Sequence, residues 1–154
     1  MNKYMQLALD KAVEGMNSNQ GGPFGAVIVR NGEVIAVAHN EVLGTNDPTA
    51  HAEIVAIRIA AKKLGRFHLS DCEIFSTCEP CPMCLSAIHW AGIRKLSFGA
   101  DRHDAAVGGF DDEFIYRLIN GTAESPLTHP DVIDKETCAA LFKTWSDKAD
   151  RTMY

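Results

Sequence analysis

Two short motifs carry the residue types best suited to chemistry in this sequence: HAE at residues 51–53 and PCPMC at residues 80–84. Histidine nitrogen and cysteine thiolate are ligands that Zn²⁺ accepts, which makes His51, Cys81 and Cys84 the candidate metal ligands. Three protein ligands leave the fourth tetrahedral position open for a water, and the metal lowers the pKa of that water towards neutrality. The motifs therefore predict one catalytic Zn²⁺ per chain.

Glu53 follows His51 by two residues, a spacing that does not place two side chains on one face of a helix. We therefore interpret Glu53 as the catalytic proton carrier, which takes a proton from the metal-bound water and passes it to a leaving amine. A closed structural zinc is the alternative interpretation. In that case Cys78 joins His51, Cys81 and Cys84 as a fourth ligand, no position stays open, and Glu53 has no role.

Two predicted helix starts bring these motifs together. The capping aspartate and the proline in residues 47–51 predict a helix over about residues 48–64, with His51 in its first turn. The prolines around Cys81 predict a second helix, with Cys81 and Cys84 on one face of its first turn. Helix N-termini carry partial positive charge that stabilises thiolates, so we expect the metal where the two N-termini converge.

Apolar periodicity predicts the remaining elements. Residues 2–17 form a helix whose predicted buried stripe is Met5, Leu9, Ala12, Val13 and Met16. The predicted strands are residues 24–30, 33–39, 72–77 and 93–98, and further helices are expected over residues 110–119 and 134–149. This order of elements predicts an α/β layered domain around a mixed sheet.

Composition limits the class of protein. The 154 residues are 46% hydrophobic, which suits one compact domain, and no run of about 18 apolar residues predicts a membrane span. Five cysteines, an odd number, favour metal binding in the reducing cytoplasm over a disulfide framework. The net charge of −5 provides no basic field for a nucleic acid, so we expect a small neutral substrate and no nucleic-acid or membrane partner.

Four stretches together resemble the bacterial guanine deaminases, a subgroup of the cytidine deaminase-like zinc deaminases. They are GPFGA at residues 22–26, NDPTAHAE at 46–53, CEPCPMC at 78–84 and AAVGGFDDEFIY at 105–116. The tRNA adenosine deaminases share much of the first three stretches, and the fourth points to the guanine deaminases.

This resemblance implies a three-layer α/β/α sandwich and the hydrolytic deamination of guanine to xanthine and ammonia. Zinc-bound hydroxide attacks the ring carbon that bears the amino group, with Glu53 as the proton shuttle. The resemblance also implies a homodimer with one Zn²⁺ per subunit, in which residues 121–154 of the single domain (residues 1–154) cross to the neighbouring subunit. Tyr154 then lies over the pocket of that subunit.

The resemblance further implies a set of contacts with the purine base. Asn40 hydrogen-bonds the base, Phe24 stacks on it, Asp112 meets its polar edge, and His89 and Trp90 shape the pocket. The residues alone leave other interpretations open, because aromatic side chains at such positions are more often core, an asparagine after a strand is often a turn residue, and an acid pair favours a helix start.

Three alternative functions follow from the same motifs. A tRNA adenosine deaminase needs a basic groove for its substrate. A deaminase of another small aminated ring, such as cytosine or the triazine ammeline, uses the same zinc chemistry. A zinc-stabilised interaction domain without catalysis is the alternative from a different class.

Overall fold

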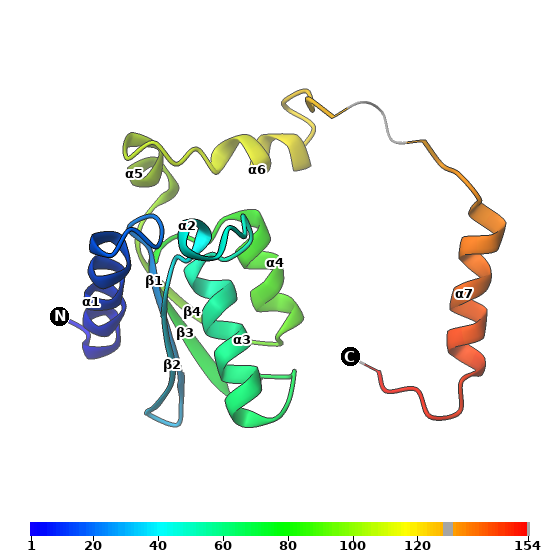
Figure 1. Ribbon diagram of the computed structural model, residues 1–154, viewed down its shortest axis with the longest axis horizontal. Helices are drawn as coiled ribbons and strands as arrows, with labels where there is room; N and C mark the ends of the chain where they lie inside the picture. The colour runs from blue at the N-terminus through cyan, green and yellow to red at the C-terminus, as the bar shows by residue number, and fades with distance from the viewer. Residues whose placement is uncertain (128–130, 154) are drawn as a thin grey trace.

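The centre of the computed structural model, which describes residues 1–127 and 131–153, is a four-stranded sheet (Figure 1). Its strands are β1 (Gly25–Arg30), β2 (Glu33–His39), β3 (Cys72–Cys78) and β4 (Lys95–Ala100), in the spatial order β2-β1-β3-β4. The strands β1 and β2 are antiparallel, β1 and β3 are also antiparallel, and β3 and β4 are parallel. The sheet is therefore mixed, as predicted.

Helices cover both faces of the sheet, which confirms the predicted three-layer α/β/α sandwich. The first helix packs on one face, and the third and fourth helices pack on the other (Figure 1). The described helices are α1 (Lys3–Asn17), α2 (Val42–Thr45), α3 (Ala52–Leu64), α4 (Pro82–Trp90), α5 (Arg102–Val107), α6 (Glu113–Ile119) and α7 (Lys135–Asp147). None of these helices is long and apolar enough to span a membrane.

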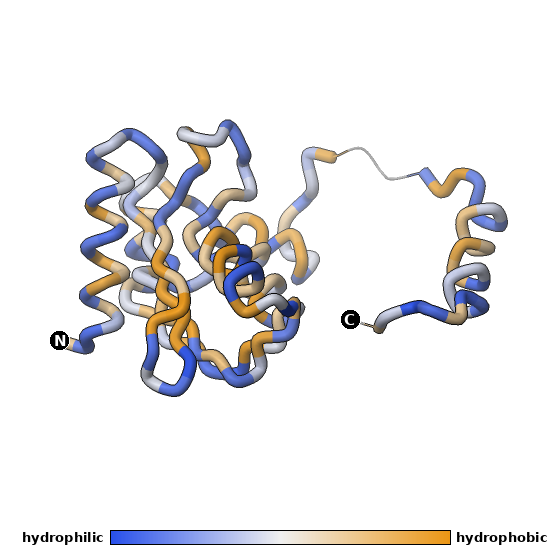
Figure 2. Tube along the Cα trace, turned by 60° about the horizontal axis from the view of Figure 1, so that its bottom comes forward, coloured by the Kyte–Doolittle hydropathy of each residue, from blue (hydrophilic) through white to orange (hydrophobic). Residues whose placement is uncertain are grey.

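The hydrophobic core lies in two layers, because alternate strand residues point to opposite faces of the sheet. Ile28 and Ile74 are fully buried beneath α3 and α4, whereas Val27 and Phe75 are buried beneath α1. Figure 2 shows the corresponding concentration of hydrophobic residues along the central strands. This rigid centre carries the ends of β1, β2 and β3 that border the candidate site.

The predicted buried stripe of α1 is wrong in most positions. The structure buries the small residues Ala8, Ala12 and Gly15, whereas Val13 and Met16 are exposed. The reason is close packing: a Cβ added to Gly25 on β1 would lie 2.0 Å from the carbonyl oxygen of Ala8. A helix backbone that lies this close to a strand leaves room only for small side chains.

We expect Gly25→Ala to lower the free energy of unfolding by about 1–3 kcal/mol, because the added methyl group displaces the α1 backbone. Urea denaturation measures this loss. Gly44→Ala is a matched control, since its added Cβ meets only the side chain of Gln20, which can move away. Equal stability of Gly25→Ala and wild type would contradict this packing argument.

The predicted start of α3 is also wrong, by four residues. Asp47 Oδ1 accepts hydrogen bonds from the backbone N–H and the hydroxyl of Thr49, at 2.8 and 2.7 Å. These bonds hold residues 47–50 in a turn, and the helix begins only at Ala52. His51 is consequently the N-cap of α3, with extended backbone angles, instead of a residue of its first turn.

The second half of the chain is the least buried part. The structure adds α2 and α5, which periodicity did not predict, and α6 begins at Glu113, three residues after the predicted start. The predicted C-terminal helix is present as α7, which stands apart from the sandwich and buries none of its residues (Figures 1 and 2).

Candidate zinc site and pocket

The three predicted metal ligands converge at the N-termini of α3 and α4. His51 Nδ1 lies 3.6 Å from Cys81 Sγ and 3.5 Å from Cys84 Sγ, and one ligand atom from each residue lies within 4.8 Å of the others. Cys81 is the N-cap of α4, one position before the predicted first turn, whereas Cys84 lies within that turn. One nitrogen and two sulfur donors at these separations fit the ligand set of an open tetrahedral zinc site.

Electrostatics at the site favour thiolate. A hydrogen bond from Cys84 and the proximity of His51 lower the pKa of Cys81 to about 4, against the opposing effect of burial. The same hydrogen bond and burial raise the pKa of Cys84. One cysteine is thus a ready ligand, and metal binding displaces the proton of the other.

Cys78 does not complete a four-ligand site. Its thiol donates a hydrogen bond to the carbonyl oxygen of Asp101 at 3.6 Å, and the group of candidate ligands among the described residues contains only His51, Cys81 and Cys84. Burial raises the pKa of Cys78 to about 11, which disfavours the thiolate that a metal requires. The arrangement therefore favours an open site over the closed structural one.

Glu53 is buried beside the three ligands without belonging to their group. It lies in the first turn of α3, with 6% of its surface exposed, and the hydroxyl of Ser76 on β3 donates a hydrogen bond to its Oε1 at 3.1 Å. Burial raises the pKa of this carboxyl group. A buried carboxyl group whose pKa is raised is suited to accept and release a proton.

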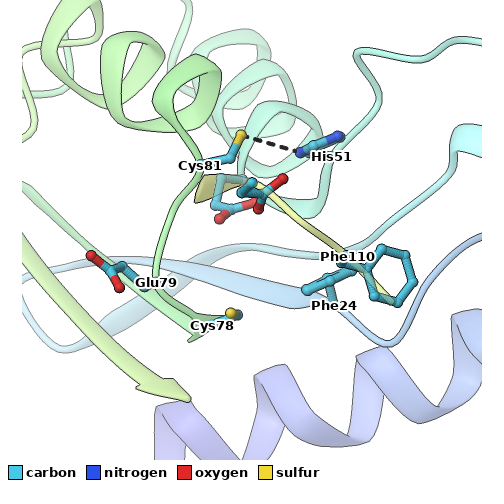
Figure 3. Close-up of a pocket in the computed structure, with 8 residues that line it drawn as sticks. Phe24, His51, Cys78, Glu79, Cys81 and Phe110 are labelled. Atoms are coloured by element: carbon cyan, nitrogen blue, oxygen red, sulfur yellow. Dashed lines mark hydrogen bonds between the residues drawn. The ribbon is translucent and has the colours of Figure 1, made fainter. Parts of the chain in front are cut away.

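A pocket opens beside the metal ligands (Figure 3). Its volume is about 120 Å³. Its lining consists of Phe24, His51, Glu53, Cys78, Glu79, Cys81, Phe110 and Asp112. The pocket therefore joins candidate metal ligands, the buried carboxyl group and two aromatic rings in a space suited to a small ring compound.

The aromatic rings of Phe24 and Phe110 and the acidic side chain of Asp112 form one wall of the pocket. The rings of Phe24 and Phe110 meet edge to face, with centroids 4.8 Å apart. Asp112 is half-buried, and burial raises the pKa of its carboxyl group. Phe24 and Asp112 were predicted site residues, whereas Phe110 was not, although it lies in the same motif as Asp112. An aromatic residue next to a predicted contact was the signal that could have identified it.

The other predicted base contacts do not line this pocket. Asn40 is buried, and its side-chain Oδ1 accepts a hydrogen bond from the backbone N–H of Val42 at 3.1 Å. The backbone N–H of Asn40 donates to the backbone carbonyl of Phe24. Trp90 is 74% exposed at the end of α4, and His89 lies beside it in a separate surface depression. Their roles stay predictions, and Tyr154 lies outside the described residues.

One histidine, two cysteines and a buried glutamate converge at two helix N-termini of an α/β/α sandwich. This combination of fold and site defines a zinc-dependent hydrolase of the deaminase type. The cytidine and deoxycytidylate deaminase zinc-binding region matches residues 1–100, a span that contains all of these residues. The chain belongs to this family of zinc-binding deaminases.

Within this family, the chain is similar to several individual deaminases. The chain is 44% identical to guanine deaminase from Bacillus subtilis (strain 168), over 98% of this chain and 97% of that protein. The crystal structure of guanine deaminase from Bacillus subtilis matches with a TM-score of 0.92, at 45% identity, and the match covers 100% of this chain and 99% of the other. The tRNA-specific adenosine deaminase of Aquifex aeolicus (strain VF5) is 39% identical, over 70% of this chain and 72% of that protein.

Proposed function

We propose that the protein is a zinc-dependent guanine deaminase, which converts guanine and water into xanthine and ammonia. The observation that carries this proposal is the convergence of His51, Cys81, Cys84 and the buried Glu53 on one small pocket. The choice of guanine rests on the similarity to the Bacillus subtilis guanine deaminase, which extends over nearly the whole chain.

The reaction adds one water to the ring carbon that bears the amino group and then breaks the carbon–nitrogen bond. His51, Cys81 and Cys84 would hold the zinc, which would supply Lewis acidity and lower the pKa of the attacking water. Glu53 would act twice: it takes one proton from the attacking water and delivers it to a ring nitrogen, then takes the second proton from the added hydroxyl and delivers it to the amine, which leaves as ammonia. Its burial keeps bulk water away from this proton transfer.

The pocket wall recognises the base in this proposal. Phe24 and Phe110 present apolar ring surface to the purine, and Asp112 meets its polar edge. Asn40, His89, Trp90 and Tyr154 keep the substrate contacts that the resemblance implies. For Asn40, the bond to Val42 occupies the side-chain oxygen and fixes the orientation of the amide, which leaves its NH₂ group for the base.

A second candidate function is the deamination of adenosine in tRNA, which the similarity to the Aquifex enzyme favours. A tRNA substrate requires phosphate contacts, and the net charge of −5 disfavours them. Deamination rates with guanine, guanosine, adenine, cytosine, ammeline and tRNA separate the candidates. Highest turnover with guanine supports the proposal, whereas turnover of tRNA together with tight, salt-sensitive tRNA binding would contradict it.

We also propose that the protein works in the cytoplasm, because a reducing compartment suits five free cysteines. It works there as a homodimer that exchanges residues 121–154 between subunits. The helix α7 exposes Leu141, Phe142 and Trp145, and an apolar helix face of this kind gains stability when it is covered.

Mixed subunits test this exchange. We expect Glu53→Ala and Tyr154→Ala to be weakly active alone and to regain activity when both chains are expressed together. In the mixed dimer, the Tyr154→Ala subunit keeps its Glu53 and receives Tyr154 from its partner. Ammonia release by the purified mixed dimer measures the effect. No gain over the separate variants, with mixed dimers present by mass spectrometry, would contradict the exchange.

A further inference from the structure

The segment that carries Phe110 and Asp112 over the pocket is attached to the sandwich at few points. It runs from α5 to α6, and of these two helices only Ala105 is a buried residue. The pair of Phe24 and Phe110 is one attachment. Since the apolar contacts are few, the position of this pocket wall depends on its polar contacts with the rest of the molecule.

Arg102 supplies the first polar contact, at the start of α5. Its Nη2 donates to Glu79 Oε1 at 2.5 Å, and its Nε and backbone N–H donate to Glu79 Oε2 at 3.2 and 3.1 Å. Both side chains are partly shielded from water, with 33% and 19% of their surfaces exposed. A forked pair of this kind fixes direction as well as distance.

Tyr116 supplies the second polar contact, on α6. Its hydroxyl donates to the carbonyl oxygen of Pro80 at 3.0 Å, and the guanidinium carbon of Arg102 lies 4.2 Å from the centre of its ring. Arg102 and Tyr116 therefore hold each other as well as the loop before α4. We call Arg102, Tyr116 and Glu79 the latch.

The latch connects the segment before a metal ligand with the segment that carries the pocket wall. Glu79 and the Pro80 carbonyl immediately precede the metal ligand Cys81, whereas Arg102 and Tyr116 lie on either side of Phe110 and Asp112. We infer that the latch positions Phe110 and Asp112 relative to the loop before α4, so that Arg102 and Tyr116 are positioning residues for substrate binding. This inference rests on the proposed guanine deamination and adds two residues that do not belong to the pocket lining.

Tyr116→Phe tests the latch, because it removes one hydroxyl and keeps the ring beneath Arg102. We expect KM for guanine to rise roughly 3- to 10-fold with zinc content unchanged, since a displaced wall weakens base contacts. Tyr4→Phe is the matched control: it also removes a hydroxyl that donates to a carbonyl at 3.0 Å, that of Gly32 in the β1–β2 turn. Arg102→Lys keeps the charge but loses the fork, and we expect a similar rise in KM.

Hydrogen–deuterium exchange of the unliganded protein gives a second measurement that does not depend on activity. We expect Tyr116→Phe to speed exchange over residues 102–119 and to leave the central strands unchanged. An unchanged KM, or unchanged exchange over this segment, would overturn the latch. Failure of the wild type to deaminate guanine would instead refute the proposed function, and the exchange measurement would still decide whether the latch holds the wall.

Discussion

Replacing Glu53 with alanine is expected to lower kcat for guanine by about 10²–10⁴-fold, because proton transfer by this carboxyl group has no substitute in the pocket. Asp112 and Glu79 also carry carboxyl groups in the pocket. Asp112 lies on another segment and is only half-buried, and Glu79 is paired with Arg102. Glu53→Gln keeps the size of the side chain and removes its proton chemistry, so the same loss is expected. Steady-state ammonia release measures both variants.

Stability and zinc content are the controls for Glu53. The carboxyl group is buried with Ser76 as its hydrogen-bond partner, so its removal relieves a desolvation cost. We expect Glu53→Ala to keep one zinc per chain and to unfold at the same temperature as wild type or at a higher one. Full deaminase activity in Glu53→Ala would show that this residue has no catalytic role and would contradict its assignment as the proton carrier.

Removing a metal ligand is expected to have the second largest effect. Loss of an outer-shell partner typically weakens metal binding 10–100-fold, so Cys84→Ala should weaken zinc binding by more than about 100-fold and abolish deamination. Metal analysis of the purified variant, followed by zinc titration, measures the loss. A chelator should inactivate the wild type, and added zinc should restore it.

Cys78→Ala is the matched control, and it also separates an open site from a closed one. It removes a thiol that lies three residues before Cys81 in the sequence. This Cys78 thiol donates a hydrogen bond to the carbonyl oxygen of Asp101. We expect this variant to keep one zinc per chain. Loss of zinc on a par with Cys84→Ala would identify Cys78 as a fourth ligand and contradict the open site.

The metal site was predictable from sequence because its information is local. His51, Cys81 and Cys84 are residue types that bind zinc. Their positions next to predicted helix starts indicate that they converge on one site. The strands and the layer order were predictable for the same reason, since hydrophobic alternation in each segment reports its burial. The exact start of α3 was not predictable, because the side chain of Asp47 stabilises a turn and not the helix.

The pocket wall and the face of α1 were not predictable in this way. The contact between Glu79 and Arg102 joins residues 23 positions apart, and that between Tyr116 and Pro80 spans 36 positions. No local pattern encodes such pairs. Ala8 is buried for a similarly non-local reason, since the absence of a side chain at Gly25 on another element decides how closely α1 approaches. Periodicity finds large apolar residues and overlooks helices that pack through small ones.

Ammonia release from guanine, measured with zinc content on the same purified sample, is the decisive test of zinc-dependent guanine deamination. We expect rapid conversion of guanine to xanthine with about one zinc per chain, and much slower release from adenine, cytosine and ammeline. A protein that holds one zinc per chain and releases no ammonia from guanine would contradict this function.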